Sequence, residues 1–318
     1  MNLEFDVPDY KKIRVIVDTD AACEADDPFA IAHALMSPKL IVKGIIAEHF
    51  KEAGSMERSF REIETILDAM DIDVPVLKGQ EGPLSDEEVD MSGAGVSQSG
   101  REKSNFGHSD RLGENTSEAV RFIIDEALRE DEKPLFILCQ GAITNVAKAL
   151  LVEPGIKDKI TVIWIGTHGE APCKAPFTEF NATNDIKAAN IVLQSGIDLW
   201  LVPSHVYITV NIGLAEIQRR IRPCGRIGEH LFRNMVDYNM SQFASWTQGE
   251  SWSLGDSPAI AIAINPGCGH YHYAKAPLVA EDTSSEVKED NPTIRIYTDV
   301  DSRYVLEDFI AKLEINYG

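Results

Sequence analysis

Five carboxylates crowd the short stretch VDTDAACEADD, residues 17–27. They are Asp18, Asp20, Glu24, Asp26 and Asp27. Carboxylates this close raise one another's pKa unless a cation neutralises them. Oxygen-only ligand sets are typical of hard cations such as Ca²⁺ and Mg²⁺. The cluster therefore predicts a metal site, and a solvated acidic loop is the simpler alternative.

The acidic stretch joins a strand-like segment to a helix-like one. The apolar run at residues 13–17 precedes it, and a helical apolar pattern at residues 27–37 follows it. In open parallel sheets, ligands bind at the carboxyl ends of the strands. Asp18 and Asp20 are expected at such an end. Asp26 and Asp27 are expected where the helix begins, a position at which an acid also serves as an ordinary helix cap.

The rest of the chain alternates strand-length apolar runs with helical patterns. Strands are expected at residues 12–20, 39–48, 73–79, 134–140, 160–166, 197–203 and 293–300. Helices are expected at residues 27–37, 55–70, 116–130, 141–151, 179–196, 212–248 (with a break at 223–225) and 302–314. The alternation predicts an α/β fold, an open and largely parallel sheet with helices on both faces, in a single domain over residues 1–318.

Two further segments stand out between these elements. Residues 79–112 form a long stretch rich in Gly, Ser and charge, and a loop of this length is more often functional than idle. Residues 257–264, SPAIAIAI, are a further apolar segment.

The composition limits the partners of the chain. With a formal charge of −21, it is expected to repel nucleic acid and anionic membranes. Its apolar runs are far shorter than the roughly 20 residues that span a bilayer. The five cysteines include no CxxC pair, which fits reduced thiols. We therefore expect a cytoplasmic protein that binds neither nucleic acid nor membrane.

Two known carboxylate templates can be compared with the acidic stretch. An EF-hand loop counted from Asp18 fails, because Ala22 stands where an oxygen ligand is required and Cys23 where Gly is required. A phosphatase of the haloacid dehalogenase type has Asp-x-Asp after its first strand, but Ala22 stands where that template has Thr or Val. A Mg²⁺-dependent phosphohydrolase with Asp18 as nucleophile therefore stays open as an alternative.

A third template extends over almost the whole chain. The acidic stretch resembles the N-terminal signature of the inosine-uridine type nucleoside hydrolases, an Asp-Thr-Asp followed by Asp-Asp at a helix start. Five more segments resemble the family in the same order: GIIA (44–47), VPVLKGQEGPL (74–84), GAITNVAKAL (141–150), TEFNATNDIKAANIVLQSG (178–196) and GDSPAIAIA (255–263).

The resemblance implies a reaction and a cofactor. The reaction is Ca²⁺-dependent hydrolysis of the N-glycosidic bond of a ribonucleoside or related riboside, giving ribose and a free base. The implied Ca²⁺ ligands are the carboxylates of Asp20, Asp27 and Asp256 and the main-chain carbonyl of Gln140. The resemblance also implies a homodimer or homotetramer.

Four more residues receive roles from the resemblance. Asp26 would be the general base that takes a proton from water, and Asp18 would orient the ligand loop. Glu179 and Asn181 would bind ribose hydroxyls. These residue types suit the reaction, because breaking an N-glycosidic bond builds positive charge on the ribose that carboxylates stabilise.

The sequence departs from the family pattern on the substrate side. The loop between Asp20 and Asp26 is two residues longer and contains Glu24, which either reaches the metal or substrate or is solvated. Gly255 stands where the family has a His that often protonates the leaving group. His108 and Trp252 are candidates to contact the substrate instead. A riboside-binding protein without catalysis therefore remains a second alternative.

Overall fold

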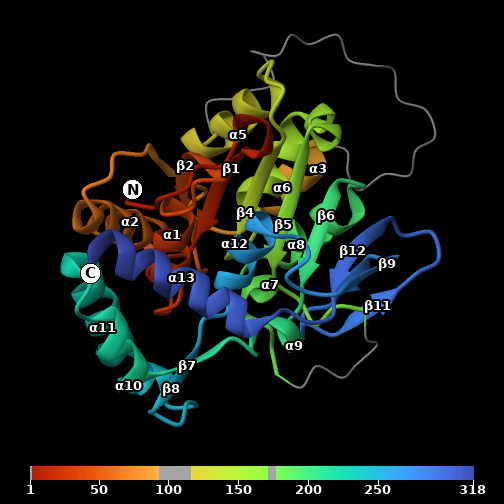
Figure 1. Ribbon diagram of the computed structural model, residues 1–318. Coiled ribbons are helices and arrows are strands. Elements are labelled where there is room, and N and C mark those ends of the chain that lie inside the picture. Colours follow the sequence, from red (N-terminus) through yellow and green to blue (C-terminus); the bar gives the residue numbers. More distant parts are fainter. Residues whose placement is uncertain (1, 93–115, 171–176) are drawn as a thin grey trace.

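An eight-stranded sheet forms the centre of the computed structural model, which describes residues 2–92, 116–170 and 177–318 (Figure 1). The strand order is β3-β2-β1-β4-β5-β6-β12-β9, and only the edge strand β9 runs antiparallel to its neighbour. The strands are β1 (Ile13–Thr19), β2 (Leu40–Ala47), β3 (Val76–Lys78), β4 (Leu135–Cys139), β5 (Ile160–Ile165), β6 (Asp198–Val202), β9 (Tyr271–Lys275) and β12 (Thr293–Tyr297). The expected α/β fold with a largely parallel sheet is confirmed.

Helices cover both faces of this sheet (Figure 1). The core on one face includes buried residues of α1 (Asp27–Leu35), α2 (Ser55–Met70), α11 (Gly225–Asn239), α12 (Ser257–Ile264) and α13 (Ser302–Tyr317). The core on the other face includes buried residues of α5 (Glu118–Leu128), α6 (Thr144–Val152) and α8 (Ile186–Gln194). In β1, Val15 and Val17 face the first set and Ile16 faces the second. Both faces of the strand are buried, which explains its unbroken apolar run.

Strand β1 is the point at which the strand order reverses. Strands β2 and β3 lie on one side of it, and β4, β5 and β6 lie on the other. In such sheets the crevice at the carboxyl ends of the two strands at the reversal is the usual ligand site. Asp18 is in register with Cys139, and the Gln140 N–H donates to the Asp18 carbonyl at 2.8 Å. The acidic stretch and Gln140 therefore lie side by side at this crevice.

The helix expected at residues 179–196 is divided into α7 (Phe180–Asn184) and α8. Asp185 lies at the joint with an extended backbone, and its carboxylate accepts the Ala188 N–H and caps α8. The prediction of one continuous helix was wrong, because this side chain starts a second helix where the apolar pattern alone continues.

Residues 212–248 are also less regular than expected. The segment begins in β7 (Asn211–Gly213), which pairs with β8 (Ser251–Ser253), and passes through α10 (Leu214–Glu216) and the π-helical turn η3 (Ile217–Ile221) to α11. A short turn, η4 (Gln242–Ala244), follows. Residues 257–264 form the helix α12. Of the long segment at residues 79–112, α3 (Asp86–Ser92) is helical, and residues 93–112 lie outside the described part.

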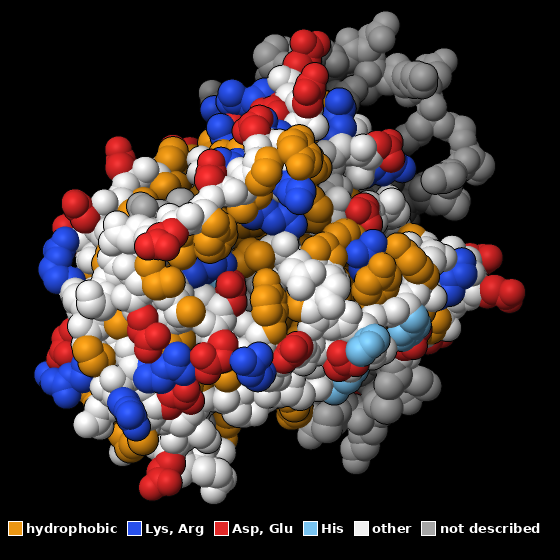
Figure 2. Space-filling model, in the orientation of Figure 1, with side chains coloured by type: hydrophobic (Ala, Val, Ile, Leu, Met, Phe, Trp, Pro, Cys, Tyr) orange, Lys and Arg blue, Asp and Glu red, His pale blue; other side chains and the backbone are white. Residues whose placement is uncertain are grey.

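The remaining elements are short. They are η1 (Asp9–Lys11), η2 (Pro154–Asp158), α9 (Ser204–Tyr207), β10 (Pro277–Val279) and β11 (Ser285–Val287), the last two forming a small antiparallel sheet. Among the described helices, none is both long and apolar enough to cross a membrane. On the face drawn in Figure 2, Lys and Arg side chains are interspersed with Asp and Glu.

Candidate active site

Three buried carboxylates meet at the reversal point of the sheet. Oxygens of Asp26, Asp27 and Asp256 all lie within 4.8 Å of one another, and we call these residues the acidic triad. Asp26 directly precedes α1, Asp27 is its first residue, and Asp256 directly precedes α12. Two segments more than 200 residues apart in sequence therefore supply one acidic centre.

The starts of α1 and α12 explain how the triad forms. Each helix has a proline in its first turn, Pro28 in α1 and Pro258 in α12, which favours a helix start at that point. The two helices pack against each other. Neither Asp26 nor Asp256 caps its helix through its side chain. The capping explanation for Asp26 is thus wrong, and its carboxylate is available for other contacts beside two helix N-termini that favour negative charge.

Oxygen atoms at the ends of β1 and β4 complete the centre. Asp20 Oδ2 and Gln140 Oε1 are buried without a hydrogen-bond partner among the described residues. The Gln140 Nε2 donates to the Asp256 carbonyl at 3.4 Å, which directs this side chain at the triad. A Cβ on Gly141 would lie 3.1 Å from Asp20 Cγ, so a glycine is needed for Asp20 to approach β4 this closely. Buried oxygens without partners fit a bound cation.

Burial raises the pKa of every acid of this centre, and repulsion between carboxylates adds to the rise for Asp20, Asp27 and Asp256. Burial raises the pKa of Asp26 to about 6, although main-chain N–H groups of Gly255 and Asp256 lower it in part. Burial and the Asp26 charge raise the pKa of Asp27 to about 7, against the effect of a hydrogen bond from the Thr19 hydroxyl. Burial and neighbouring acids also raise the pKa values of Asp20 and Asp256 well above the usual range. Perturbations of this kind are typical of functional sites.

Asp18 is held by the first turn of α6. The Asn145 Nδ2 donates to Asp18 Oδ1 at 3.0 Å and to Glu48 Oε2 at 2.9 Å, so one amide lies between two buried carboxylates. Burial raises the pKa of Asp18 to about 7. The role of Asn145 and Glu48 was not expected. Asn145 belongs to the GAITN segment that carries part of the resemblance, and this was the available signal.

Two β-branched residues beside the site have left-handed backbone conformations. Ile143 has φ +54° in the turn after β4, and Thr167 has φ +58° after β5. Such conformations cost on the order of 1–3 kcal/mol each and concentrate at functional sites. The Thr167 N–H donates to Glu179 Oε2 at 2.8 Å, so this backbone serves to hold a candidate substrate-binding residue.

Glu179 and Asn181 lie together at the carboxyl end of β5. The buried Glu179 carboxylate caps α7 through the Ala182 N–H at 2.9 Å and also accepts a hydrogen bond from the Tyr207 hydroxyl at 2.9 Å. The Asn181 Nδ2 donates to the Ile165 carbonyl at 2.9 Å. Tyr207 was not singled out from the sequence, where no pattern distinguishes it.

The remaining candidates differ in their surroundings. Glu24 is half-buried, and burial and the charge of Asp26 raise its pKa to about 8. Trp252 is buried in β8, in ring contact with Tyr238 and Trp246, so its ring is part of the core. His108 lies outside the described residues.

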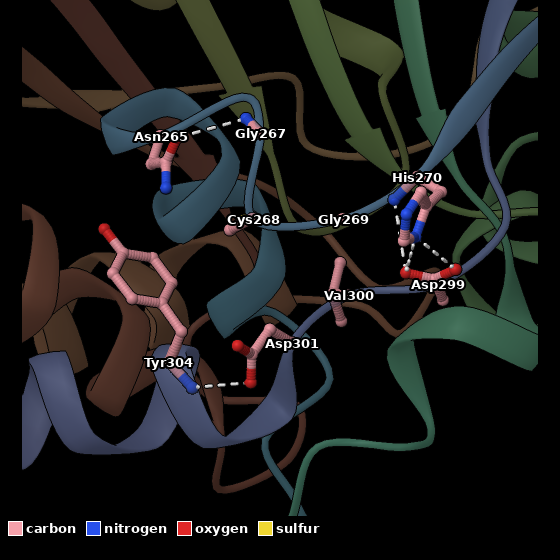
Figure 3. Close-up of a pocket in the computed structure, with 9 residues that line it drawn as sticks. All are labelled: Asn265, Gly267, Cys268, Gly269, His270, Asp299, Val300, Asp301 and Tyr304. Carbon is pink, nitrogen blue, oxygen red and sulfur yellow. Dashed lines mark hydrogen bonds and ion pairs between the residues drawn. The ribbon is translucent and has the colours of Figure 1, made fainter.

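A surface hollow lies apart from the acidic centre (Figure 3). The connection from α12 to β9 and the start of α13 line it, and the His270 Nδ1 is 3.0 Å from Asp299 Oδ2 at its edge. No acid of the centre lines this hollow. It does not bear on the chemistry of the triad.

Sequence comparison identifies relatives over most of the chain. A model of the family described as inosine-uridine preferring nucleoside hydrolase matches residues 15–307. The pyrimidine-specific ribonucleoside hydrolase RihA of Salmonella typhimurium is 28% identical over 252 residues, 77% of this chain and 75% of that protein. RihA of Escherichia coli O1:K1 is 29% identical over 249 residues, with the same shares of each chain.

Comparison with solved structures shows the same fold. A purine-preferring ribonucleoside hydrolase from Gardnerella vaginalis superposes with a TM-score of 0.74 at 22% identity, covering 96% of this chain and 99% of that one. A plant nucleoside hydrolase, PpNRh1, superposes with a TM-score of 0.70 at 19% identity, covering 95% and 99%.

Proposed function

The chain belongs to the inosine-uridine preferring nucleoside hydrolase family, and from this premise we propose that it hydrolyses the N-glycosidic bond of a ribonucleoside or related riboside. The products are ribose and a free base. The observation that carries the proposal is the buried acidic triad at the reversal point of the sheet. An acidic centre suits this reaction because carboxylates stabilise the positive charge that develops on the ribose.

We assign Ca²⁺ as the cofactor, with Asp20, Asp27, Asp256 and the Gln140 main-chain carbonyl as its ligands. The oxygen-only donor set and the buried oxygens without partners support a hard cation here. When bound, the cation neutralises the clustered carboxylates and makes a neighbouring water more acidic. Asp18 is assigned to hold the ligand loop, since its carboxylate is tied to Asn145 beside the β4 end.

We assign Asp26 as the general base. Its carboxylate lies within the triad, does not cap α1, and accepts main-chain hydrogen bonds from Gly255 and Asp256 that fix its orientation. A fixed carboxylate beside the cation can take the proton of the attacking water. Glu179 and Asn181 are assigned to the ribose hydroxyls, on the ground that both lie where β5 ends at the same edge of the sheet.

The proposed substrates share a ribose, and the proposal does not restrict the base that is attached to it. The relatives include pyrimidine-specific RihA and a purine-preferring hydrolase, so the proposal covers ribosides of both kinds. A homodimer or homotetramer and a cytoplasmic location are part of the proposal. Light scattering on the purified protein tests the first, and fractionation of the source cells tests the second.

The decisive experiment measures ribose released from a panel of purine and pyrimidine ribosides in the presence of Ca²⁺. The wild type is expected to release ribose, and Asp26→Asn is expected to reduce turnover by about a thousandfold. Asp73→Asn, an exposed acid before β3, is the matched control that keeps full activity. Riboside binding without any ribose release would show a riboside-binding protein in place of a hydrolase. Phosphate release from phosphoesters would show a phosphohydrolase instead.

A further inference from the structure

We propose that Tyr207 and Gly255 form a specificity-determining pair, in which the tyrosine ring fills the space that the glycine leaves between the acidic triad and Glu179. This inference rests on the proposed function, because it names the residues that select among ribosides. Neither residue is a ligand or base in that proposal, so the pair adds a separate determinant to the site.

The first observation places the hydroxyl end of Tyr207. This residue ends α9, and the helix is fixed to the end of β5 by a hydrogen bond from the Ser204 N–H to the Thr167 carbonyl at 2.9 Å. The Tyr207 hydroxyl donates to Glu179 Oε1 at 2.9 Å. The other carboxylate oxygen of Glu179 accepts main-chain hydrogen bonds from Thr167 and Ala182. The phenol is therefore the one side-chain donor that the structure describes on Glu179.

The second observation places the ring of Tyr207. A Cβ on Gly255 would lie 3.2 Å from Tyr207 Cδ2 and 3.3 Å from Asp26 Oδ2. The ring edge and the Asp26 carboxylate thus flank the same small space. The Ser253 hydroxyl also donates to the Tyr207 carbonyl at 3.1 Å, which ties α9 to the segment that leads into α12. Any side chain at position 255 would have to displace the ring or the carboxylate.

Together these contacts make one side chain span the two halves of the proposed site. Its hydroxyl end is at the residue assigned to ribose, and its ring edge is beside the residue assigned to the attacking water. Substrates differ in the group on the anomeric carbon, where that water attacks. A partly buried aromatic ring beside Asp26 limits the space for that group and offers it an apolar surface. The hydroxyl and the ring therefore have separable effects.

The test uses Tyr207→Phe, Tyr207→Ala, Gly255→Ala and the Tyr207→Ala/Gly255→Ala double variant of the full chain, with purine and pyrimidine ribonucleosides as substrates. Tyr207→Phe loses only the hydrogen bond to Glu179, so KM should rise about tenfold for both classes with their kcat/KM ratio unchanged. Tyr207→Ala removes the ring, so the kcat/KM ratio between the two classes should shift by about tenfold or more.

The double variant tests whether the two residues act as a pair. Gly255→Ala should lower kcat/KM by about tenfold in the wild-type background and by less than about threefold when Tyr207 is already Ala, because contacting residues are not additive. Tyr10→Ala is the matched control, since this exposed tyrosine lies in η1 before the amino end of β1. The Ca²⁺-induced shift in melting temperature reports that each variant is folded.

The proposed pair would be overturned if the effects of Tyr207→Ala and Gly255→Ala on kcat/KM were additive and the kcat/KM ratio between purine and pyrimidine substrates did not change. A wild type that releases no ribose would overturn the proposed function instead. In that case the pair is tested by binding instead. Calorimetry gives the dissociation constants of the same ribosides, and the ratio between the purine and pyrimidine values is compared among the same variants. A wild type that neither hydrolyses nor binds any riboside overturns both.

Discussion

Gly141 determines how closely Asp20 can approach β4. The space that a Cβ would need is taken by the Asp20 carboxylate, with Cγ and Oδ1 both 3.1 Å away. Contacts this short force a neighbouring atom to move. Because Asp20 is buried in a closely packed core, an added methyl group would displace the Asp20 carboxylate. A single methyl group at this position is therefore a probe of the proposed ligand geometry.

We predict that Gly141→Ala weakens Ca²⁺ binding by about tenfold or more while the chain still folds. Calorimetric titration with Ca²⁺ measures the affinity, and far-ultraviolet circular dichroism checks the fold. Gly82→Ala is the matched control, because a Cβ there would meet no atom within 4 Å, and its affinity should equal that of the wild type. Equal affinities for all three proteins would remove Asp20 from the ligand set.

At the scale of elements, the Asp185 carboxylate connects three segments of the chain by hydrogen bonds. Its carboxylate accepts the Ala188 N–H at 2.9 Å, the Leu84 N–H at 2.8 Å and the Thr144 hydroxyl at 3.0 Å. It thereby connects the start of α8, the loop before α3 and the start of α6. The side chain is buried, so its removal leaves these donors without a partner away from water.

We predict that Asp185→Ala lowers the free energy of unfolding by about 2–4 kcal/mol in urea denaturation. Asp301→Ala provides the graded comparison. Asp301 caps α13 through the Tyr304 N–H alone, at an exposed position, and its loss should cost about 1 kcal/mol. If Asp185→Ala lowered the free energy of unfolding by no more than Asp301→Ala does, the connection of three segments through Asp185 would be contradicted.

The elements that the sequence predicted well are those whose buried positions follow a regular pattern along the chain. Strand β1 is buried on both faces and reads as a continuous apolar run, and α2 carries a clear apolar stripe at helical spacing. The division at Asp185 was not predictable, because the apolar positions of α7 and α8 continue one helical pattern. Strands β9 and β11 were missed because they are short and most of their residues are exposed.

At the scale of the whole molecule, the site depends on contacts that no local pattern reports. The acids at residues 20–27 were recognisable as a cluster, and Asp256 was assigned only through the resemblance to a family. The approach of Tyr207 to Gly255 depends on where α9 and the start of α12 lie in the folded chain. The residue roles in the site remain predictions. Cation binding can be tested on the whole molecule through its free energy of unfolding.

We predict that the metal-free protein loses stability as pH rises from about 5 to 8, and that Ca²⁺ cancels this loss. The folded-state pKa values of Asp26, Asp18, Asp27 and Glu24 are raised to about 6, 7, 7 and 8. In the unfolded chain these groups titrate near pH 4. The folded state therefore holds more protons in this range, and its free energy of unfolding falls as the pH rises through the folded pKa values.

The measurement is urea denaturation at several pH values, in excess Ca²⁺ and in a chelator. The difference in free energy of unfolding between the two conditions should grow by at least about 2 kcal/mol from pH 5 to pH 8, because the cation binds the ionised carboxylates. Taking the difference cancels the titration of groups far from the site. In Asp27→Asn, which removes one of the clustered charges, the growth should be smaller. A difference that stays constant with pH would show that no cation binds these acids.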